Sequence, residues 1–172
     1  MAIFARWLLR GSLGEGERVI SDAQKLRDLF PGLDACEWDI TSPDEVCYNC
    51  VAWAVGDSSR WWEPTTPYYW PEKAPRQYTV AAYRAAFETL GYEACESRAL
   101  EAGYEKIALY GSNGEWQHAA KQLRDGTWSS KIGYLQDIMH ASLEALEGDD
   151  YGRVEVIMRR STTERPASST AH

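Results

Sequence analysis

The sequence predicts an α+β fold in which N-terminal helices pack on an antiparallel β-sheet, and two observations support this prediction. Segments with helical periodicity occupy the first half of the chain, up to about residue 90. Short alternating segments separated by turn residues follow from residue 106 onward. Helices first and a strand meander after them are typical of α+β domains. The 172 residues are enough for one domain with a substantial core.

Two helices and one short apolar segment are expected before the sheet. Residues 21–30 carry apolar side chains at helical spacing, and Pro31-Gly32 ends this helix. The segment 50–55 is wholly apolar, is compatible with a helix and ends at a glycine. The second clear helix is expected over residues 78–90. Residues 57–76 combine many Trp and Tyr with four prolines, which predicts an ordered loop that lines a groove or covers a small core of its own.

The strands are expected over residues 106–110, 116–123 and 127–132. A two-residue turn at Asp125-Gly126 closes the second hairpin and pairs Arg124 with Thr127, which places His118 opposite Gly133. In this register Ser129, Lys131 and Gly133 share the face of the sheet that carries His118.

A helix over residues 135–146 and a last strand over residues 154–158 complete the expected elements. Residues 1–20 are interpreted as an N-terminal arm and residues 21–160 as a papain-like cysteine hydrolase domain. The Ser/Thr-rich residues 161–172 are interpreted as a disordered tail.

The charge and the cysteines restrict the function classes. A net charge of −8 argues against binding to nucleic acid, because phosphates repel an acidic surface. No apolar run approaches the roughly 18 residues that a membrane span needs, and no secretory signal is recognised, so a cytoplasmic location is expected. Cys47 and Cys50 form a C-x-x-C pair without a second pair at zinc-ligand spacing. We expect no metal and no cofactor, and a regulatory disulfide between these two cysteines remains an alternative.

Cys50 is the candidate nucleophile because it begins the apolar segment, and a thiol at a helix start can be activated by an imidazole. His118 is the candidate base because a strand fixes the direction of its side chain. The alternative for Cys50 is an inert core thiol, and for His118 a histidine that only satisfies its hydrogen bonds.

A third group should orient the imidazole by accepting a hydrogen bond from it. Asp137 is the candidate for this role, and His140 would share its face of the expected helix. Tyr48 and Asn49 precede the nucleophile and could form an oxyanion hole together with the Cys50 backbone N–H. Their alternatives are core packing for Tyr48 and a helix cap for Asn49.

The stretches 48–54, 118–122 and 126–133, together with Gly91-Tyr92, resemble an uncharacterised bacterial family of papain-like cysteine hydrolases of the NlpC and CHAP kind. Its members carry an Asn-Cys helix and a His strand followed by a Gly-x-Trp-x-x-Lys-x-Gly hairpin. The resemblance covers about residues 25–160. It implies a papain-like fold with Cys50 as nucleophile and His118 as base, and it leaves the third residue open.

In many cell-wall peptidases of this kind a His or another polar residue on the next strand is the third residue. That place holds Ser129, Ser130 and Lys131 in this chain, so Asp137 is preferred by default and Lys131 is interpreted as a substrate or structural contact. Ser129, Ser130 and His140 remain alternatives for the third role.

The predicted function is that of a thiol protease or amidase that cleaves an amide bond in a peptide or amide substrate, which could be part of a protein. Two alternatives remain open. One is a non-catalytic protein-interaction module on the same fold, and the other is a toxin or effector that deamidates a protein. The sequence leaves the oligomeric state open.

Overall fold

The structure is a computed structural model that describes residues 21–162. The helices, in chain order, are α2 (Asp22–Leu29), the 3-10 helix η1 (Pro31–Ala35), α3 (Cys50–Val55), α4 (Val80–Glu88) and the 3-10 helix η2 (Leu143–Leu146). The strands are β1 (Trp38–Ile40), β2 (Glu93–Cys95), β3 (Tyr104–Ser112), β4 (Glu115–Gln122), β5 (Trp128–Lys131), β6 (Asp137–His140) and β7 (Arg153–Ser161).

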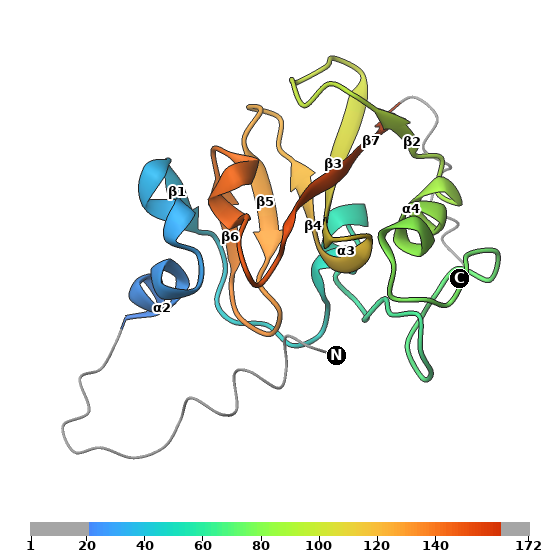
Figure 1. Cartoon of the computed structure of the whole chain (residues 1–172), viewed down its shortest axis with the longest axis horizontal. Coiled ribbons are helices and arrows are strands. Elements are labelled where there is room, and N and C mark those ends of the chain that lie inside the picture. Colours follow the sequence, from blue (N-terminus) through green and yellow to red (C-terminus); the bar gives the residue numbers. More distant parts are fainter. Residues whose placement is uncertain (1–20, 163–172) are drawn as a thin grey trace, which may run out of the picture.

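Within the described range, seven strands form one antiparallel sheet in the order β1-β6-β5-β4-β3-β7-β2 (Figure 1). The strands β3, β4, β5 and β6 follow one another as a meander, and β7 returns to the other side of β3. The predicted α+β class is therefore confirmed, because the helices precede or flank an antiparallel sheet.

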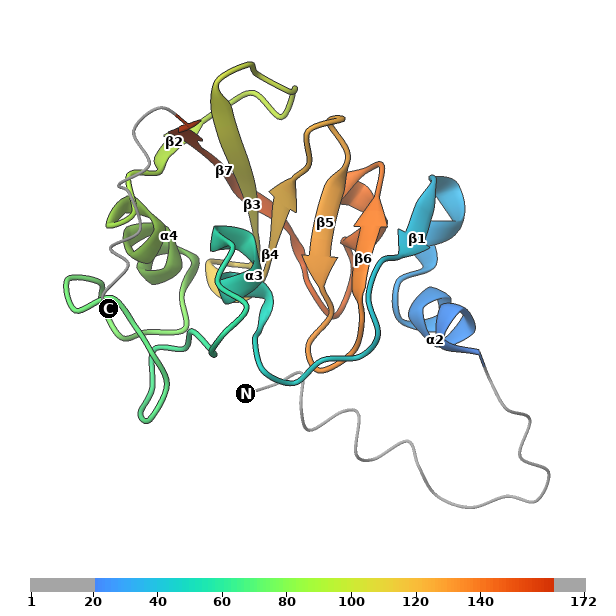
Figure 2. The same ribbon diagram turned by 180° about the vertical axis from the view of Figure 1, so that it is seen from behind.

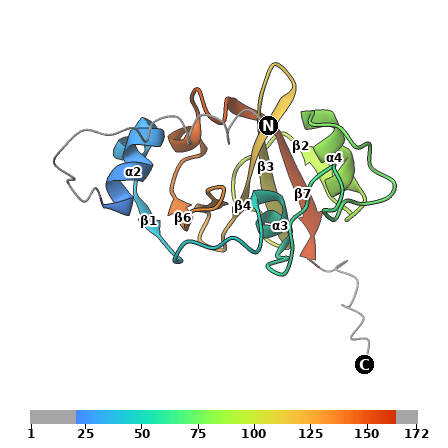
Figure 3. The ribbon, with the colours of Figure 1, turned by 90° about the horizontal axis from the view of Figure 1, so that it is seen from below.

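The sheet separates two hydrophobic cores. The first core lies between α3, α4 and one face of the sheet, and Figure 2 shows α3 in front of β3 and β4. The second core lies on the other face, beneath α2, η1 and η2. Seen from below, α2 and α4 lie at opposite ends of the sheet (Figure 3). Alternate residues of each central strand enter opposite cores.

The short helix α3 is fixed by residues at both of its ends and by a side chain that bonds the sheet. The Asn49 side chain caps it by accepting a hydrogen bond from the backbone N–H of Ala52, and Gly56 ends it in the left-handed conformation with φ +79. Trp53 attaches it to the sheet, because its indole Nε1 donates to Ser129 Oγ on β5 at 3.0 Å. The predicted helix over residues 50–55 is confirmed, and its first residue is Cys50.

The other predictions agree with the structure in part. The expected helices over 21–30 and 78–90 correspond to α2 and α4, and the last strand is longer than expected because β7 covers Arg153–Ser161. The N-terminal arm lies outside the described residues. So does the predicted tail apart from residues 161 and 162, and Ser161 is still part of β7.

The helix expected over residues 135–146 is wrong. Residues 137–140 form β6 between β5 and β1, and only residues 143–146 are helical, as the 3-10 helix η2. Both faces of β6 are covered, so its residues do not alternate between buried and exposed positions. Such a short buried strand cannot be distinguished from a helix by periodicity.

Candidate active site

Cys50 is the first residue of α3, and its partly buried side chain packs against the first core. The backbone N–H of Ala119, on β4, is directed at the sulfur and favours the thiolate, as do the N–H groups of Val51 and of Cys50 itself. Burial outweighs these groups and raises the pKa of the Cys50 thiol to about 11. The free protein therefore holds Cys50 as a neutral thiol.

His118 is part of a buried chain of hydrogen bonds that links three strands. Its Nε2 lies 3.0 Å from Ser130 Oγ on β5, and the same Oγ lies 2.9 Å from Nε2 of His140 on β6. His140 Nδ1 lies 2.8 Å from the carbonyl oxygen of Ser142. All three linked side chains are at most 1% exposed to solvent.

The chain fixes the tautomer of each imidazole. A carbonyl oxygen can only accept, so His140 carries its proton on Nδ1 and accepts at Nε2 from the Ser130 hydroxyl. Ser130 Oγ then accepts from Nε2–H of His118. This assignment leaves Nδ1 as the ring nitrogen of His118 that bears the lone pair and can take up a proton.

Burial keeps both imidazoles neutral. Burial, and to a smaller extent the neighbouring His140, holds the pKa of His118 well below 6.5. Burial lowers the pKa of His140 to about 4, against the opposing effect of the Ser142 carbonyl. The ring of Tyr151 stacks on His118 with centroids 4.2 Å apart and planes 3° from parallel, which closes the histidine off from that side.

The predicted register between β4 and β5 is wrong by one residue. The hairpin pairs Ala120 with Ser130 and Gln122 with Trp128, and a longer loop replaces the two-residue turn that the sequence suggested. A shift of one residue moves every side chain of a strand to the other face. Ser130 therefore shares the face of His118, whereas Ser129 and Lys131 lie on the face covered by α3.

Cys50 and His118 approach β4 from its two sides. The His118 side chain enters the second core with that of Tyr110, whereas Ala119, the next residue, belongs to the first core beneath α3. The thiol thus lies at the peptide N–H that directly follows His118. Within residues 21–162 no hydrogen bond joins the thiol to the imidazole, so the expected pair is adjacent along β4 but not in contact.

Asp137 does not orient His118. Its Oδ2 accepts a 2.7 Å hydrogen bond from the hydroxyl of Tyr48, and it lies on β6 opposite Lys131, on the α3 face. Its other oxygen, Oδ1, is buried without a hydrogen-bond partner among the described residues. Because residues 137–140 form a strand, Asp137 and His140 point to opposite faces, contrary to the helix that the sequence suggested.

The predicted oxyanion and substrate residues have structural roles. The Asn49 amide caps α3 and bonds both backbone groups of Trp62, so its polar atoms are already used. The Tyr48 hydroxyl is occupied by Asp137, and burial together with this bond raises its pKa. Lys131 is fully buried and donates to the backbone carbonyl of Leu135, so it is not placed to contact a substrate. Its charge favours the Cys50 thiolate.

The remaining cysteines do not alter this site. All four cysteines of the described range are free thiols, so the alternative disulfide between Cys47 and Cys50 is not formed. Cys47 is exposed, and a hydrogen bond to Glu45 raises its pKa. Among residues 21–162 no group of three or more His, Cys, Asp and Glu side chains is arranged to hold a metal ion. In the same range no helix is both long and apolar enough to cross a membrane.

The aromatic loop 57–76 has two parts. Trp62 and Trp70 are buried in the first core, so this part of the loop packs against α3, α4 and the sheet and does not form a small core of its own. The partly buried Trp61 and the exposed Tyr68 and Tyr69 of the loop, together with the exposed Tyr78 and Tyr134 outside it, form what we call the aromatic surface. Trp61 joins two of these rings, because its centroid lies 6.0 Å from that of Tyr68 and 4.9 Å from that of Tyr134.

A family model described as a domain of unknown function, DUF7689, matches residues 39–159. The chain belongs to the DUF7689 family. The matched range of this DUF7689 protein includes Cys50, His118, Ser130 and His140, and it spans the sheet from β1 almost to the end of β7. Neither the curated proteins nor the solved structures contain a match to the chain.

Proposed function

We propose that this DUF7689 protein is a papain-like thiol hydrolase that cleaves an amide bond, with Cys50 as nucleophile and His118 as general base. The third position is assigned to Ser130 and, through it, to His140. One observation carries the proposal. The buried hydrogen-bond chain leaves Nδ1 of His118 basic, and the imidazole is attached to the residue before the N–H that faces the Cys50 thiol.

The proposed reaction has two stages. The sulfur of Cys50 attacks the carbonyl carbon of the substrate while Nδ1 of His118 takes the thiol proton, and the departing amine receives that proton as the C–N bond breaks. Water then attacks the resulting thioester, with His118 as base, and the carboxylic acid leaves as the thiol forms again. When His118 becomes charged, its Nε2–H stays bonded to Ser130, which holds the ring in place.

The charge states of Cys50 and His118 distinguish the proposed reaction from one that starts from a thiolate–imidazolium ion pair. A thiol with a pKa of about 11 and a neutral imidazole do not form an ion pair, so the thiol proton has to be transferred during the attack. Because the two side chains lie on opposite sides of β4 in the free protein, the proposed transfer requires that they come together when substrate binds. Proton transfer by a positioned base contributes roughly 10² to 10⁴ to a rate. The proposal therefore depends on His118 acting in the acylation step, and it predicts a weakly reactive thiol in the absence of an acyl substrate.

Acylation by p-nitrophenyl acetate tests the proposal. The expected result is a stoichiometric burst of p-nitrophenol and an acetyl group that mass spectrometry locates on Cys50. Cys50→Ala should abolish the burst, whereas Cys47→Ala, which removes the exposed thiol three residues earlier, should leave it unchanged. Acetylation that follows Cys47 instead of Cys50 would contradict the assignment.

The aromatic surface favours a second candidate, a non-catalytic module that binds an extended peptide. A partly exposed Trp ring in contact with exposed Tyr rings is typical of surfaces that bind extended, proline-containing peptides. This candidate requires that a proline-containing peptide bind the Cys50→Ala variant with unchanged affinity and lose affinity when Trp61 is replaced by Ala. Proteolysis that needs Cys50, or toxicity on expression that needs it, would favour the hydrolase or a deamidase instead.

A further inference from the structure

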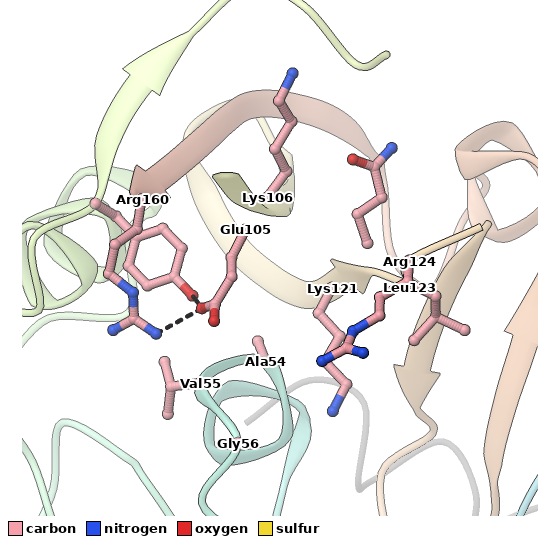
Figure 4. A pocket seen from close by; sticks show the side chains of 11 residues that line it. Ala54, Val55, Gly56, Glu105, Lys106, Lys121, Leu123, Arg124 and Arg160 are labelled. Atoms are coloured by element: carbon pink, nitrogen blue, oxygen red, sulfur yellow. Dashed lines mark hydrogen bonds and ion pairs between the residues drawn. The ribbon is translucent and has the colours of Figure 1, made fainter. Parts of the chain in front are cut away.

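A cavity of about 250 Å³ lies at the C-terminal end of α3, away from Cys50. Figure 4 shows its walls: Ala54, Val55 and Gly56 from α3 on one side, Lys121 and Arg124 from β4 and its following turn, and Glu105 with Arg160 from β3 and β7. Pockets for drug-sized ligands measure roughly 300–1,000 Å³. A cavity of this size suits a small ligand or the terminal group of a longer one.

The cavity concentrates positive charge in an acidic protein. The chain has a net charge of −8, yet four cationic residues line this space. Arg160 is neutralised by Glu105, whose Oε2 lies 2.6 Å from its Nη2. Lys106 also lines the cavity, but its side chain points away in Figure 4 and donates to the carbonyls of Ser97 and Ala99.

Lys121 and Arg124 are the two cations without a counter-ion. Neither makes a side-chain hydrogen bond or an ion pair with any residue in the described part of the chain. Figure 4 shows both side chains on the same wall of the cavity, facing the turn at Gly56. Two like charges on one wall of a partly closed site repel each other unless an anion binds there.

Two further features support a site for an anion. The ammonium of Lys121 lies 3.3 Å from the centre of the Trp53 ring, which holds this cation in place, and burial lowers its pKa. The Nε atom of Arg160 is buried and has no acceptor among the described residues, although its two Nη atoms are bonded. A polar nitrogen of this kind needs an acceptor oxygen.

We propose that this cavity binds a small anionic group, a carboxylate or a phosphate, through Lys121 and Arg124, with Arg160 on the opposite wall. The site is separate from Cys50, because it is formed at the other end of α3. It does not depend on the proposed hydrolase activity. A peptide carboxylate and a phosphate ester present the same acceptor oxygens, so the chemistry of the wall accommodates either source.

Titration of the full chain, followed by ¹H–¹⁵N NMR spectroscopy, tests this site with two probes. Inorganic phosphate represents phosphate ligands and N-acetylglycine represents a peptide carboxylate, and N-acetylglycinamide is the neutral control. At least one anionic probe should shift the amide signals of Gly56 and Lys121 saturably, and the shift should weaken as NaCl is raised. The probe that binds more tightly identifies the source of the anion.

Charge-neutral variants give the decisive comparison. Lys121→Gln and Arg124→Gln should each weaken binding by roughly tenfold or more, the loss expected for one charge-assisted hydrogen bond. Arg153→Gln changes the net charge equally at an exposed position outside the cavity and should leave the affinity unchanged. Absence of saturable shifts with both anions, or equal weakening by Arg153→Gln, would overturn the proposal. Since Cys50 takes no part in this binding, these outcomes are independent of any acylation result.

Discussion

Oγ of Ser130 lies 3.0 Å from Nε2 of His118, so β5 supplies the group that fixes the imidazole. Among the polar residues of β5 and β6 that could bond His118, this contact singles out Ser130 as its hydrogen-bond partner. It also links His118 to His140, which would otherwise be an isolated buried base. The hydrogen bond between Ser130 and His118 is possible only because β4 and β5 pair in the register that places Ala120 opposite Ser130.

Replacement of Ser130 by Ala should slow the acylation of Cys50 by at least about tenfold, because Nε2–H of His118 loses its acceptor and the ring loses its orientation. Ser129→Ala is the matched control. It makes the same change one residue earlier, on the face covered by α3, where the hydroxyl only accepts from Trp53. Burst kinetics of both variants, with circular dichroism as a check of folding, measure the difference. Equal rates for the two variants would exclude Ser130 from the site.

The histidine chain should make the protein less stable in mild acid. The unfolded chain takes up a proton on His140 near pH 6.5, whereas the folded protein does so only near pH 4. Protonation in this window favours the unfolded state, so the free energy of unfolding should fall as the pH drops from 6.5 to 4, by about 3 kcal/mol from this residue. His118, whose pKa is also lowered, adds to the fall. Urea denaturation at a series of pH values, on the wild type and on His140→Gln, measures this contribution. A variant with the same pH dependence as the wild type would contradict it.

The bond between Tyr48 and Asp137 should matter for stability. Tyr48→Phe removes the 2.7 Å partner of a carboxylate whose other oxygen already lacks one, so the free energy of unfolding should fall by roughly 1–3 kcal/mol. Tyr68→Phe, at an exposed ring, should change it by less than about 0.5 kcal/mol. Chemical denaturation of both variants provides the comparison, and equal stabilities would show that the buried bond contributes nothing.

Gly152 lets β7 begin close enough to β3 for Tyr151 to cover His118. A Cβ atom at residue 152 would lie 2.1 Å from the carbonyl oxygen of Gly111, and the backbone there has φ +69. Gly152→Ala should therefore cost roughly 2 kcal/mol or more. Gly114→Ala separates the two causes, because Gly114 has φ +80 but open space around its Cβ, and it should cost only about 1 kcal/mol. If the two variants lose equal stability in urea, the contact with Gly111 is not a constraint.

Local signals predicted much of the fold. The Pro31-Gly32 stop after α2 and the glycine after α3 marked those helix ends, because such signals act within a few residues, and helical periodicity placed α4. Asn113-Gly114 forms the turn of the β3–β4 hairpin, where the chain adopts positive φ at both residues, which is a local signal of the same kind. The strands β1 and β2 were not predicted, because each has three residues and depends on pairing with a distant strand.

The candidate site was harder to predict, because it depends on register. Cys50 and His118 could be singled out from their residue types and local context. The third residue required the pairing of β4 with β5, which the loop before Trp128 shifts by one residue from the expected hairpin. Asp137 was preferred by default as the carboxylate that follows the expected strand, whereas sheet pairing makes residues 137–140 a strand that turns Asp137 to the α3 face, away from His118.

The rate of Cys50 acylation in His118→Gln, measured with p-nitrophenyl acetate at pH 7 in a Cys47→Ser background, decides whether His118 is the base. We expect a fall of roughly 10² or more relative to the same background with His118 intact, because His118 is the base assigned to the thiol. We also expect the intact protein to keep its rate as the pH falls from 7 through 6.5, because the lowered pKa of His118 keeps the imidazole neutral below the ordinary histidine pKa. An unchanged rate in His118→Gln, with the fold retained, would contradict the assignment of His118 as the base.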